Sequence, residues 1–125
     1  MKKTAIILSL LVASTGVAHA KRLPKPLGVA LHNVTIYACA DNTKLQVRYY
    51  SLSDNSLDFV KVNLNGKIYT LPHAVSASGA KYSDWHQLTW WTKGDEGTVY
   101  AQNDGPEDTW PAQHADCRAD RKSVV

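Results

Sequence analysis

Residues 60–70 read Val-Lys-Val-Asn-Leu-Asn-Gly-Lys-Ile-Tyr-Thr, and this stretch carries the clearest structural signal in the chain. Val60, Val62 and Leu64 alternate with polar residues, which is the period of a strand with one buried face. Asn65-Gly66 follows at once and leads into a second run of β-forming residues. Asn-Gly between two such runs is typical of a two-residue hairpin turn. The stretch therefore predicts an antiparallel hairpin.

The same alternation extends along the chain on both sides of this hairpin. Further short strands are expected over residues 33–38, 44–49, 74–78, 80–84, 88–92 and 98–102. No segment shows a sustained helical period. Seven or eight short strands at this spacing are typical of an antiparallel barrel or sandwich. We favour an all-β barrel, because closure removes exposed sheet edges from so small a domain.

The C-terminal part of the sequence predicts a different kind of structure. From Asp104 onward the chain contains Pro106 and Pro111, and we expect an irregular tail. Cys39 and Cys117 are the two cysteines of the chain. An even count in an oxidising compartment favours a disulfide, and two cysteines allow one pairing. We expect this bridge to hold the tail beside the first strand and to close the barrel.

The N-terminal residues predict export across a membrane. Lys2 and Lys3 precede an apolar stretch that runs to Val17, and Ala18-His19-Ala20 has the small-x-small pattern of a cleavage site. We expect residues 1–20 to be a signal peptide and the mature protein to be periplasmic. The apolar stretch is short for a membrane span, so an uncleaved anchor is the weaker alternative. No cysteine stands at the cleavage site to carry a lipid, so no membrane anchor is expected.

The mature chain is expected to consist of a leader and one domain. Residues 21–30 combine two prolines with basic side chains and predict a flexible leader, and residues 31–125 predict the barrel domain. Loss of the two signal-peptide lysines would reduce the net charge from +3 to +1. The charge is uneven, since residues 94–125 carry 7 acidic and 3 basic side chains. This asymmetry can steer a partner, but no basic, aromatic-interleaved stripe suggests nucleic acid.

Three patterns that resemble enzyme sites are weak. Ser53-Asp54-Asn55 and Ser78-Gly79-Ala80-Lys81 have the form of two motifs of penicillin-recognising enzymes, but their order is reversed and the third motif is missing. The acidic pairs Asp95-Glu96 and Glu107-Asp108 would point to opposite faces of an extended chain. The histidines lack metal-ligand spacing, so neither a metal nor a cofactor is expected from His32, His73, His86 and His114.

One region of the chain combines small residues, a lysine and several tryptophans. Small side chains at residues 76–80 predict a low-profile loop that can enter a narrow cleft. Lys93 precedes Gly94 and is therefore expected at a turn, with its cation projecting. Trp90 and Trp91 are adjacent, so in a strand one faces the core and the other faces the surface. An ordinary hairpin with aromatic packing is the alternative interpretation.

These residues resemble two motifs of the bacterial inhibitors of C-type lysozyme, the membrane-bound and periplasmic types known as MliC and PliC. Ser78-Gly79-Ala80-Lys81-Tyr82 is similar to the first motif, S-G-x-x-Y, and strand alternation turns Lys81 away from Ala80 and Tyr82. Trp91-Thr92-Lys93-Gly94-Asp95-Glu96 is similar to the second motif, a Lys-Gly turn after an aromatic strand. The similarity extends from about Tyr37 to Cys117. Because the sequence has no cysteine at the cleavage site to carry a lipid, it resembles the periplasmic type more than the membrane-bound type.

The resemblance implies an eight-stranded antiparallel barrel that inhibits a host C-type lysozyme and is not an enzyme. That lysozyme cleaves glycosidic bonds with two carboxyl groups at the bottom of a cleft. The resemblance further implies that the first motif enters this cleft, that Ser78 hydrogen-bonds a catalytic carboxyl group, and that Lys93 pairs with the catalytic carboxylates. Tyr82 would support the loop from below. The expected lysozyme-binding residues are Ser78, Gly79, Ala80, Tyr82, Lys93 and Gly94.

Two other functions stay open at the level of sequence. A lipocalin-like barrel would bind a small ligand in its interior, although large inward-facing Trp, Tyr and Leu side chains favour a filled barrel. An envelope hydrolase is the third interpretation, and it is weakened by the lack of a convergent catalytic triad. The protein is expected to be a monomer or a homodimer.

Overall fold

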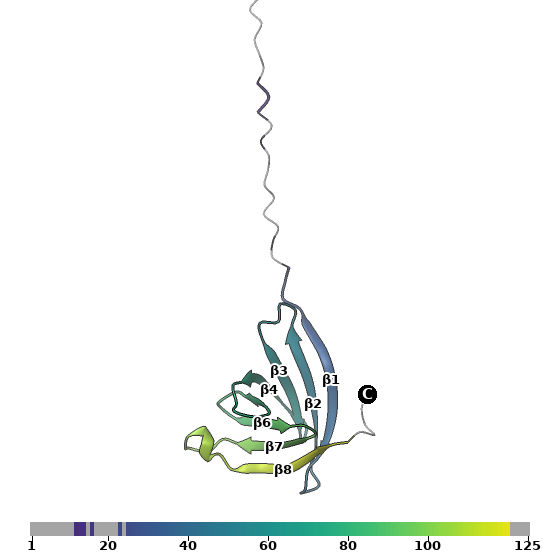
Figure 1. Ribbon diagram of the computed structural model, residues 1–125, viewed down its shortest axis with the longest axis vertical. Coiled ribbons are helices and arrows are strands. Elements are labelled where there is room, and N and C mark those ends of the chain that lie inside the picture. Colours follow the sequence, from purple (N-terminus) through teal and green to yellow (C-terminus); the bar gives the residue numbers. More distant parts are fainter. Residues whose placement is uncertain (1–11, 15, 17–22, 24, 121–125) are drawn as a thin grey trace, which may run out of the picture.

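The computed structural model describes residues 12–14, 16, 23 and 25–120, so the expected signal peptide lies largely outside the described residues. Eight strands form one closed antiparallel barrel in which each strand pairs with its neighbours along the chain, and this confirms the predicted fold class. Figure 1 shows β1, β2 and β3 running steeply while β6, β7 and β8 cross them. The strands are β1 (Val29–Ala38), β2 (Lys44–Leu52), β3 (Asp58–Leu64), β4 (Lys67–Ala74), β5 (Ala80–Ser83), β6 (Leu88–Lys93), β7 (Glu96–Ala101) and β8 (Ala112–Ala119).

The Asn65-Gly66 turn joins β3 and β4, as predicted. Leu64 pairs with Lys67, and the two residues between them have φ angles of 52° and 83°. Positive φ at both central positions is the requirement of a type I′ turn, which Asn and Gly tolerate best. Val60 and Val62 of β3 are fully buried, so the alternation in this stretch does mark the inward face.

Side chains fill the interior of the barrel. Trp90 is fully buried, meets the Tyr37 ring edge-on at 4.8 Å between centroids, and donates a hydrogen bond of 3.2 Å to the Tyr49 hydroxyl. Gly97 makes room for this indole, because a Cβ there would lie 2.3 Å from the Trp90 ring. The aliphatic part of the core consists of Leu45, Val47, Val60, Val62, Leu64, Leu71, Leu88 and Val99. The interior space is therefore occupied by the protein itself.

The expected strand over residues 74–78 is wrong. β4 ends at Ala74, and residues 75–79 form a loop that leads into β5. The Ser76 hydroxyl lies within hydrogen-bond distance of two carbonyl oxygens of this loop, at 3.0 Å from Ser78 and 3.1 Å from Gly79. Gly79 has a φ of 67°, which a strand does not accommodate. Hydrogen bonds within the loop therefore take the place of the interstrand hydrogen bonds that the predicted strand would have made.

The expected irregular tail is also wrong in part, because residues 107–119 contain a short 3-10 helix (Glu107–Thr109) and then β8. β8 pairs with β7 along most of its length and with the end of β1 at two positions. The predicted Cys39–Cys117 disulfide is present and joins this last strand to the end of β1. Within the described part of the chain, no helix is long and apolar enough to cross a membrane.

Candidate functional site

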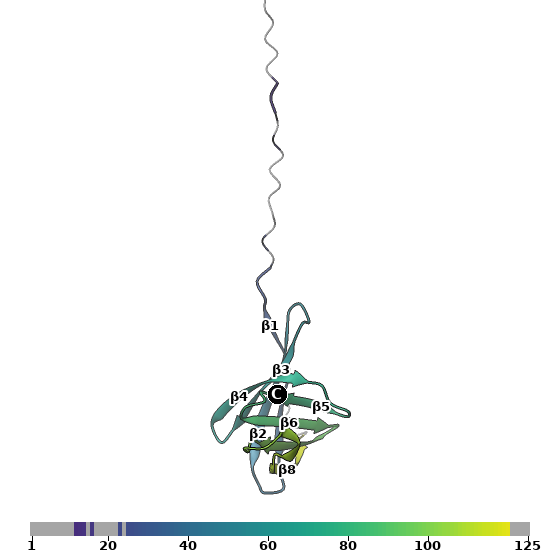
Figure 2. The same cartoon turned by 90° about the vertical axis from the view of Figure 1, so that its left-hand side faces the viewer.

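Strand pairing brings the two sequence motifs side by side. β5 carries the end of the first motif and β6 carries the start of the second. The two strands are paired neighbours in the barrel wall (Figure 2). Ala80 pairs with Thr92, so the loop of residues 75–79 ends beside the end of β6, where Lys93 stands. Ser78 and Lys93, which lie fifteen positions apart in the sequence, are thereby presented at the same end of this strand pair.

Gly79 allows the loop to approach β6 closely. A Cβ at this position would lie 2.2 Å from the Thr92 carbonyl oxygen and 2.8 Å from Cγ of Lys93. The φ of 67° is in the left-handed region, which glycine adopts without strain. Only a residue without a side chain therefore fits between the Ser78 loop and Lys93.

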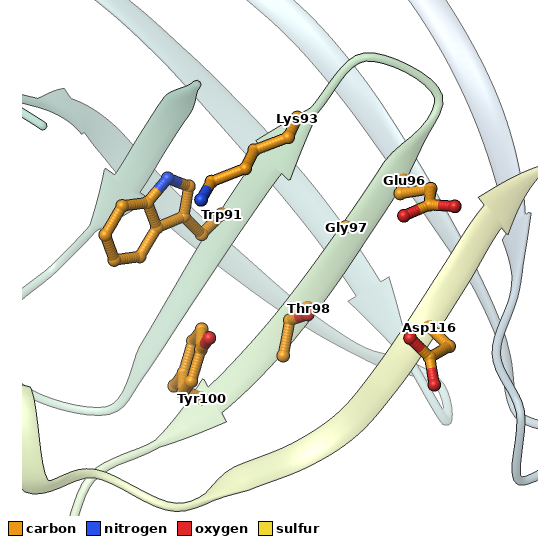
Figure 3. Close-up of a pocket in the computed structure, with 7 residues that line it drawn as sticks. All are labelled: Trp91, Lys93, Glu96, Gly97, Thr98, Tyr100 and Asp116. Carbon is orange, nitrogen blue, oxygen red and sulfur yellow. The ribbon is translucent and has the colours of Figure 1, made fainter. Parts of the chain in front are cut away.

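Trp91, the first residue of the second motif, contacts both the Ser78 loop and Lys93 from the outer face of β6. Its indole nitrogen donates a hydrogen bond of 2.8 Å to the Ser78 carbonyl oxygen. The Lys93 ammonium lies 5.5 Å from the centroid of the same ring, and Figure 3 shows the lysine side chain bent back over the indole. This distance is within the range of a cation–π interaction. One side chain thus links the loop backbone to the lysine.

Lys93 stands at the start of a tight turn between β6 and β7. It pairs with Glu96 across a two-residue connection, in which Gly94 has a φ of 60°. Ser78, Lys93 and Gly94 are all exposed. Among the described residues, Lys93 makes no ion pair within 4 Å. Its positive charge is therefore available to a partner.

Lys81 differs from Lys93 in that its charge is already compensated. Its ammonium lies 2.5 Å from a carboxylate oxygen of Glu107, in the 3-10 helix that precedes β8. It also lies 4.8 Å from the ring centroid of Trp85 and 5.2 Å from that of Trp91. Only 11 % of the Lys81 side chain is exposed, so this lysine contributes little free charge to the surface.

Tyr82 faces the interior side of β5, whereas Lys81 faces the outer side, as strand alternation predicted. The Tyr82 ring packs against His73 at 5.3 Å and Tyr49 at 5.9 Å between centroids. Burial raises the pKa of the Tyr82 hydroxyl, and the nearby Tyr49 acts in the same direction. Tyr82 is therefore partly buried against the core and points to the opposite side of β5 from Lys81.

A surface pocket of about 360 Å³ lies beside Lys93 on the outer face of β6, β7 and β8 (Figure 3). Trp91 and Lys93 form one side of it, and the carboxylates of Glu96 and Asp116 stand away from them on the other. The sequence had singled out Lys93 but not Asp116, because the segment that carries Asp116 was expected to be irregular. The opposed charges make this end of the barrel strongly polar.

The described residues show no arrangement suited to metal chemistry. No three histidine, cysteine or acidic side chains gather within the part of the chain that the structure describes. His114 instead lies 2.6 Å from a carboxylate oxygen of Asp41, and His32 lies 2.5 Å from the Ser51 hydroxyl. These histidines take part in local hydrogen bonds.

Comparison with known proteins identifies relatives of this chain. Residues 37–108, which include both motifs, match the family described as membrane-bound lysozyme-inhibitor of c-type lysozyme. A membrane-bound lysozyme inhibitor of C-type lysozyme from Cupriavidus necator is 36% identical over 97 residues, which cover 76% of this chain and 75% of that protein.

Two further relatives carry the same description. The protein from Pseudomonas aeruginosa is 42% identical over 73 residues, and the protein from Yersinia enterocolitica is 43% identical over 72 residues. Each match covers 58% of this chain and 56% of the relative. The chain thus spans little more than half the length of these two proteins.

Proposed function

Because this chain belongs to the family of membrane-bound lysozyme inhibitors of C-type lysozyme, we propose that it too inhibits a C-type lysozyme. In this proposal it acts as a protein ligand that blocks peptidoglycan hydrolysis and catalyses no reaction. The observation that carries the proposal is the placement of an exposed serine loop beside Lys93, a lysine in no ion pair with a described residue. The filled barrel interior argues against a small-ligand carrier.

The mechanism that we propose is insertion of this loop into the active-site cleft of the lysozyme. Two carboxyl groups carry out hydrolysis in that cleft, one as general acid and one as nucleophile or electrostatic stabiliser. A lysine ammonium beside them would neutralise the negative charge that the reaction requires, and the loop would exclude the polysaccharide. Ser78 would hydrogen-bond a catalytic carboxyl group, and Lys93 would pair with the catalytic carboxylates.

The remaining family-motif residues have supporting roles in this proposal. Gly79 and Ala80 keep the inserted loop narrow, because they add little or no side chain beyond the backbone. Gly94 allows the tight turn that presents Lys93. Tyr82 packs against Tyr49 and His73 on the inner side of β5, so in this proposal it supports the strand that follows the loop and does not enter the cleft.

We also propose that the protein acts in the periplasm after removal of residues 1–20, with residues 21–30 as a leader whose last two residues, Val29 and Ala30, already belong to β1. The support is the basic, apolar and small-residue pattern at the N-terminus. N-terminal sequencing of the protein recovered from a periplasmic extract should begin at Lys21. Recovery with Met1 in the membrane fraction would contradict this part of the proposal.

The central experiment follows lysis of a cell-wall suspension by C-type lysozyme in the presence of purified residues 21–125. Near-equimolar protein should suppress lysis, and titration calorimetry should show one binding event. Lys93→Ala should weaken both effects, whereas Lys61→Ala, which removes an exposed lysine from β3, should leave them unchanged. Equal potency against a goose-type lysozyme would point to sequestration of the substrate and would contradict the proposed mechanism.

A further inference from the structure

We infer that Trp91 is a positioning residue of the inhibitory site, whose indole fixes the Ser78 loop and the Lys93 ammonium relative to each other. The inference rests on the proposed function and adds to it a residue that is not among the expected lysozyme contacts. It follows from three sets of contacts around one side chain.

The first contact fixes the backbone of the loop. Trp91 Nε1 donates a 2.8 Å hydrogen bond to the main-chain oxygen of Ser78, which is the residue proposed to reach the lysozyme carboxyl group. Because the acceptor belongs to the backbone, the bond holds the loop whatever side chain stands at position 78. The Ser76 hydroxyl is near the same oxygen, at 3.0 Å, so two donors converge on this carbonyl.

The second contact restricts the lysine. Lys93 is exposed and has a flexible four-carbon chain, so binding must reduce its rotamer freedom. The Trp91 ring lies 5.5 Å from the ammonium and favours conformers in which the side chain bends over the indole. Cγ of the same lysine lies beside Gly79 of the loop. Restriction of a side chain before binding lowers the entropic cost of the complex.

The third set of contacts holds Trp91 itself. Lys81 lies over the same ring at 5.2 Å and is anchored by Glu107. Tyr100 of β7 packs at 6.4 Å between ring centroids. Tyr100 on the neighbouring strand, together with Lys81 that Glu107 anchors, therefore holds the indole in position beside the Ser78 loop and Lys93.

The test compares the lysozyme affinity of Trp91→Phe and Trp91→Leu with that of the wild type. Trp91→Phe keeps an aromatic face under Lys93 but removes the hydrogen-bond donor, so the dissociation constant should rise about 3- to 10-fold. Trp91→Leu removes both contacts and should raise it about 30-fold or more. Thermal unfolding and near-ultraviolet circular dichroism confirm that each variant is folded.

Trp110→Phe is the matched control. Trp110 also donates its indole N–H to a loop carbonyl oxygen, that of Gly105 at 3.2 Å, but none of its hydrogen bonds within the described part of the chain involves Ser78 or Lys93. Like Trp91→Phe, Trp110→Phe removes a hydrogen bond from an indole N–H to a loop carbonyl oxygen. It should lower the melting temperature without changing the dissociation constant.

A thermodynamic cycle separates positioning from direct contact with lysozyme. If Trp91 acts through the two motifs, then Trp91→Leu should raise the dissociation constant of a Ser78→Ala, Lys93→Ala double variant by a clearly smaller factor than that of the wild type, because coupled residues are not additive. If Trp91→Leu weakens binding as much in the double variant as in the wild type, the inference is wrong. It is also wrong if Trp91→Phe and Trp91→Leu bind with wild-type affinity while Lys93→Ala binds weakly. Wild-type affinity of both Ser78→Ala and Lys93→Ala would instead overturn the proposed function.

Discussion

Gly79 lies so close to Thr92 that a Cβ on residue 79 would stand 2.2 Å from the Thr92 carbonyl oxygen. The loop of the first motif therefore runs so close to the strand of the second that residue 79 has no room for a side chain. Gly79→Ala combines a steric clash with a left-handed φ, and we expect it to cost about 2–4 kcal/mol of stability or to displace the loop. Lysozyme affinity should fall at least about tenfold, as measured by titration calorimetry.

The control for this substitution is Gly66→Ala. Gly66 also has a positive φ, of 83°, but a Cβ there would meet nothing within 4 Å. The substitution should cost only about 1 kcal/mol of stability and leave lysozyme affinity unchanged. Equal affinity losses in the two variants would show that backbone strain alone, and not the Gly79–Thr92 approach, controls binding.

Lys93→Ala should have the larger effect of the two proposed contact residues. Truncation of one partner of a desolvated charge pair costs roughly 2–5 kcal/mol, so the dissociation constant should rise about 30-fold or more. Ser78→Ala removes a hydrogen bond to a charged group and should cost roughly 1–3 kcal/mol. Titration calorimetry on folded variants gives both values, and the reverse order would be inconsistent with charge neutralisation in the cleft.

Lys81→Ala should act on stability more than on binding. Lys81 and Glu107 form an ion pair with only 11% and 21% of their side chains exposed, so removal of the lysine leaves a partly buried carboxylate unpaired. We expect a loss of about 1–3 kcal/mol in urea unfolding, and a smaller affinity loss than for Ser78→Ala. The double variant with Glu107→Gln should recover part of the stability, whereas additive losses would show that the pair is not coupled.

Stability should fall at alkaline pH because of three tyrosines. Burial raises the pKa of Tyr37, Tyr49 and Tyr82 above the ordinary value of 10.0. The folded protein therefore retains protons that the unfolded chain releases, so this contribution is complete below about pH 10 and is lost as the pH rises further. Urea unfolding followed from pH 8 to 11 should show the decline beginning near pH 10.

Tyr49→Phe provides the comparison for this pH dependence. The substitution removes one of the three tyrosine hydroxyls with a raised pKa. The free energy of unfolding should therefore fall less steeply with pH above pH 10. The substitution also removes the acceptor of the Trp90 indole hydrogen bond, so stability at pH 7 should fall by about 1–3 kcal/mol. A slope equal to that of the wild type would mean that another group causes the alkaline loss.

Reduction of the disulfide should lower stability markedly. Cys39 and Cys117 are 78 positions apart, and a loop of this length corresponds to about 4 kcal/mol in the chain-entropy model. Unfolding by urea should shift to lower concentration with reductant, while the Cys39→Ser, Cys117→Ser variant should show no shift. Two alkylatable thiols in freshly isolated protein would contradict the bridge in solution.

The sequence predicted the strands whose burial follows a simple alternation. Val60, Val62 and Leu64 face the core, and Asn65-Gly66 turns the chain as expected. β8 was missed because Cys117 is its one buried residue and backbone pairing with β7 holds it in place. Its sequence therefore lacks the alternation of apolar and polar residues that predicts a strand. Residues 74–78 were taken as a strand because Val75 alternates with small residues, although Val75 is exposed in a loop. The expected total of eight strands was right, but one predicted strand was absent and one real strand was missed.

The candidate site shows a similar division. The motif residues Ser78 and Lys93 could be located from sequence, because each motif is local. The Trp91 bond to the Ser78 backbone and the Glu107 contact with Lys81 depend on strand register and on a segment that looked irregular. Such contacts join positions 13 and 26 residues apart, and no local pattern encodes them. One of Trp90 and Trp91 was expected at the surface, but that it is Trp91, and that its indole links the Ser78 loop to Lys93, required the fold.

The order of the strands also determines when the protein can be completed. The barrel closes through β8, the last strand to be synthesised, and until then β1 and β7 keep unpaired edges. Cys39 likewise emerges 78 residues before its partner. If the chain is exported N-terminus first, most of the sheet would therefore cross the membrane before β8 and would form an open intermediate with unpaired, aggregation-prone strand edges. Any factor that shields strand edges, or that oxidises Cys39 before Cys117 is available, would have to act in that interval.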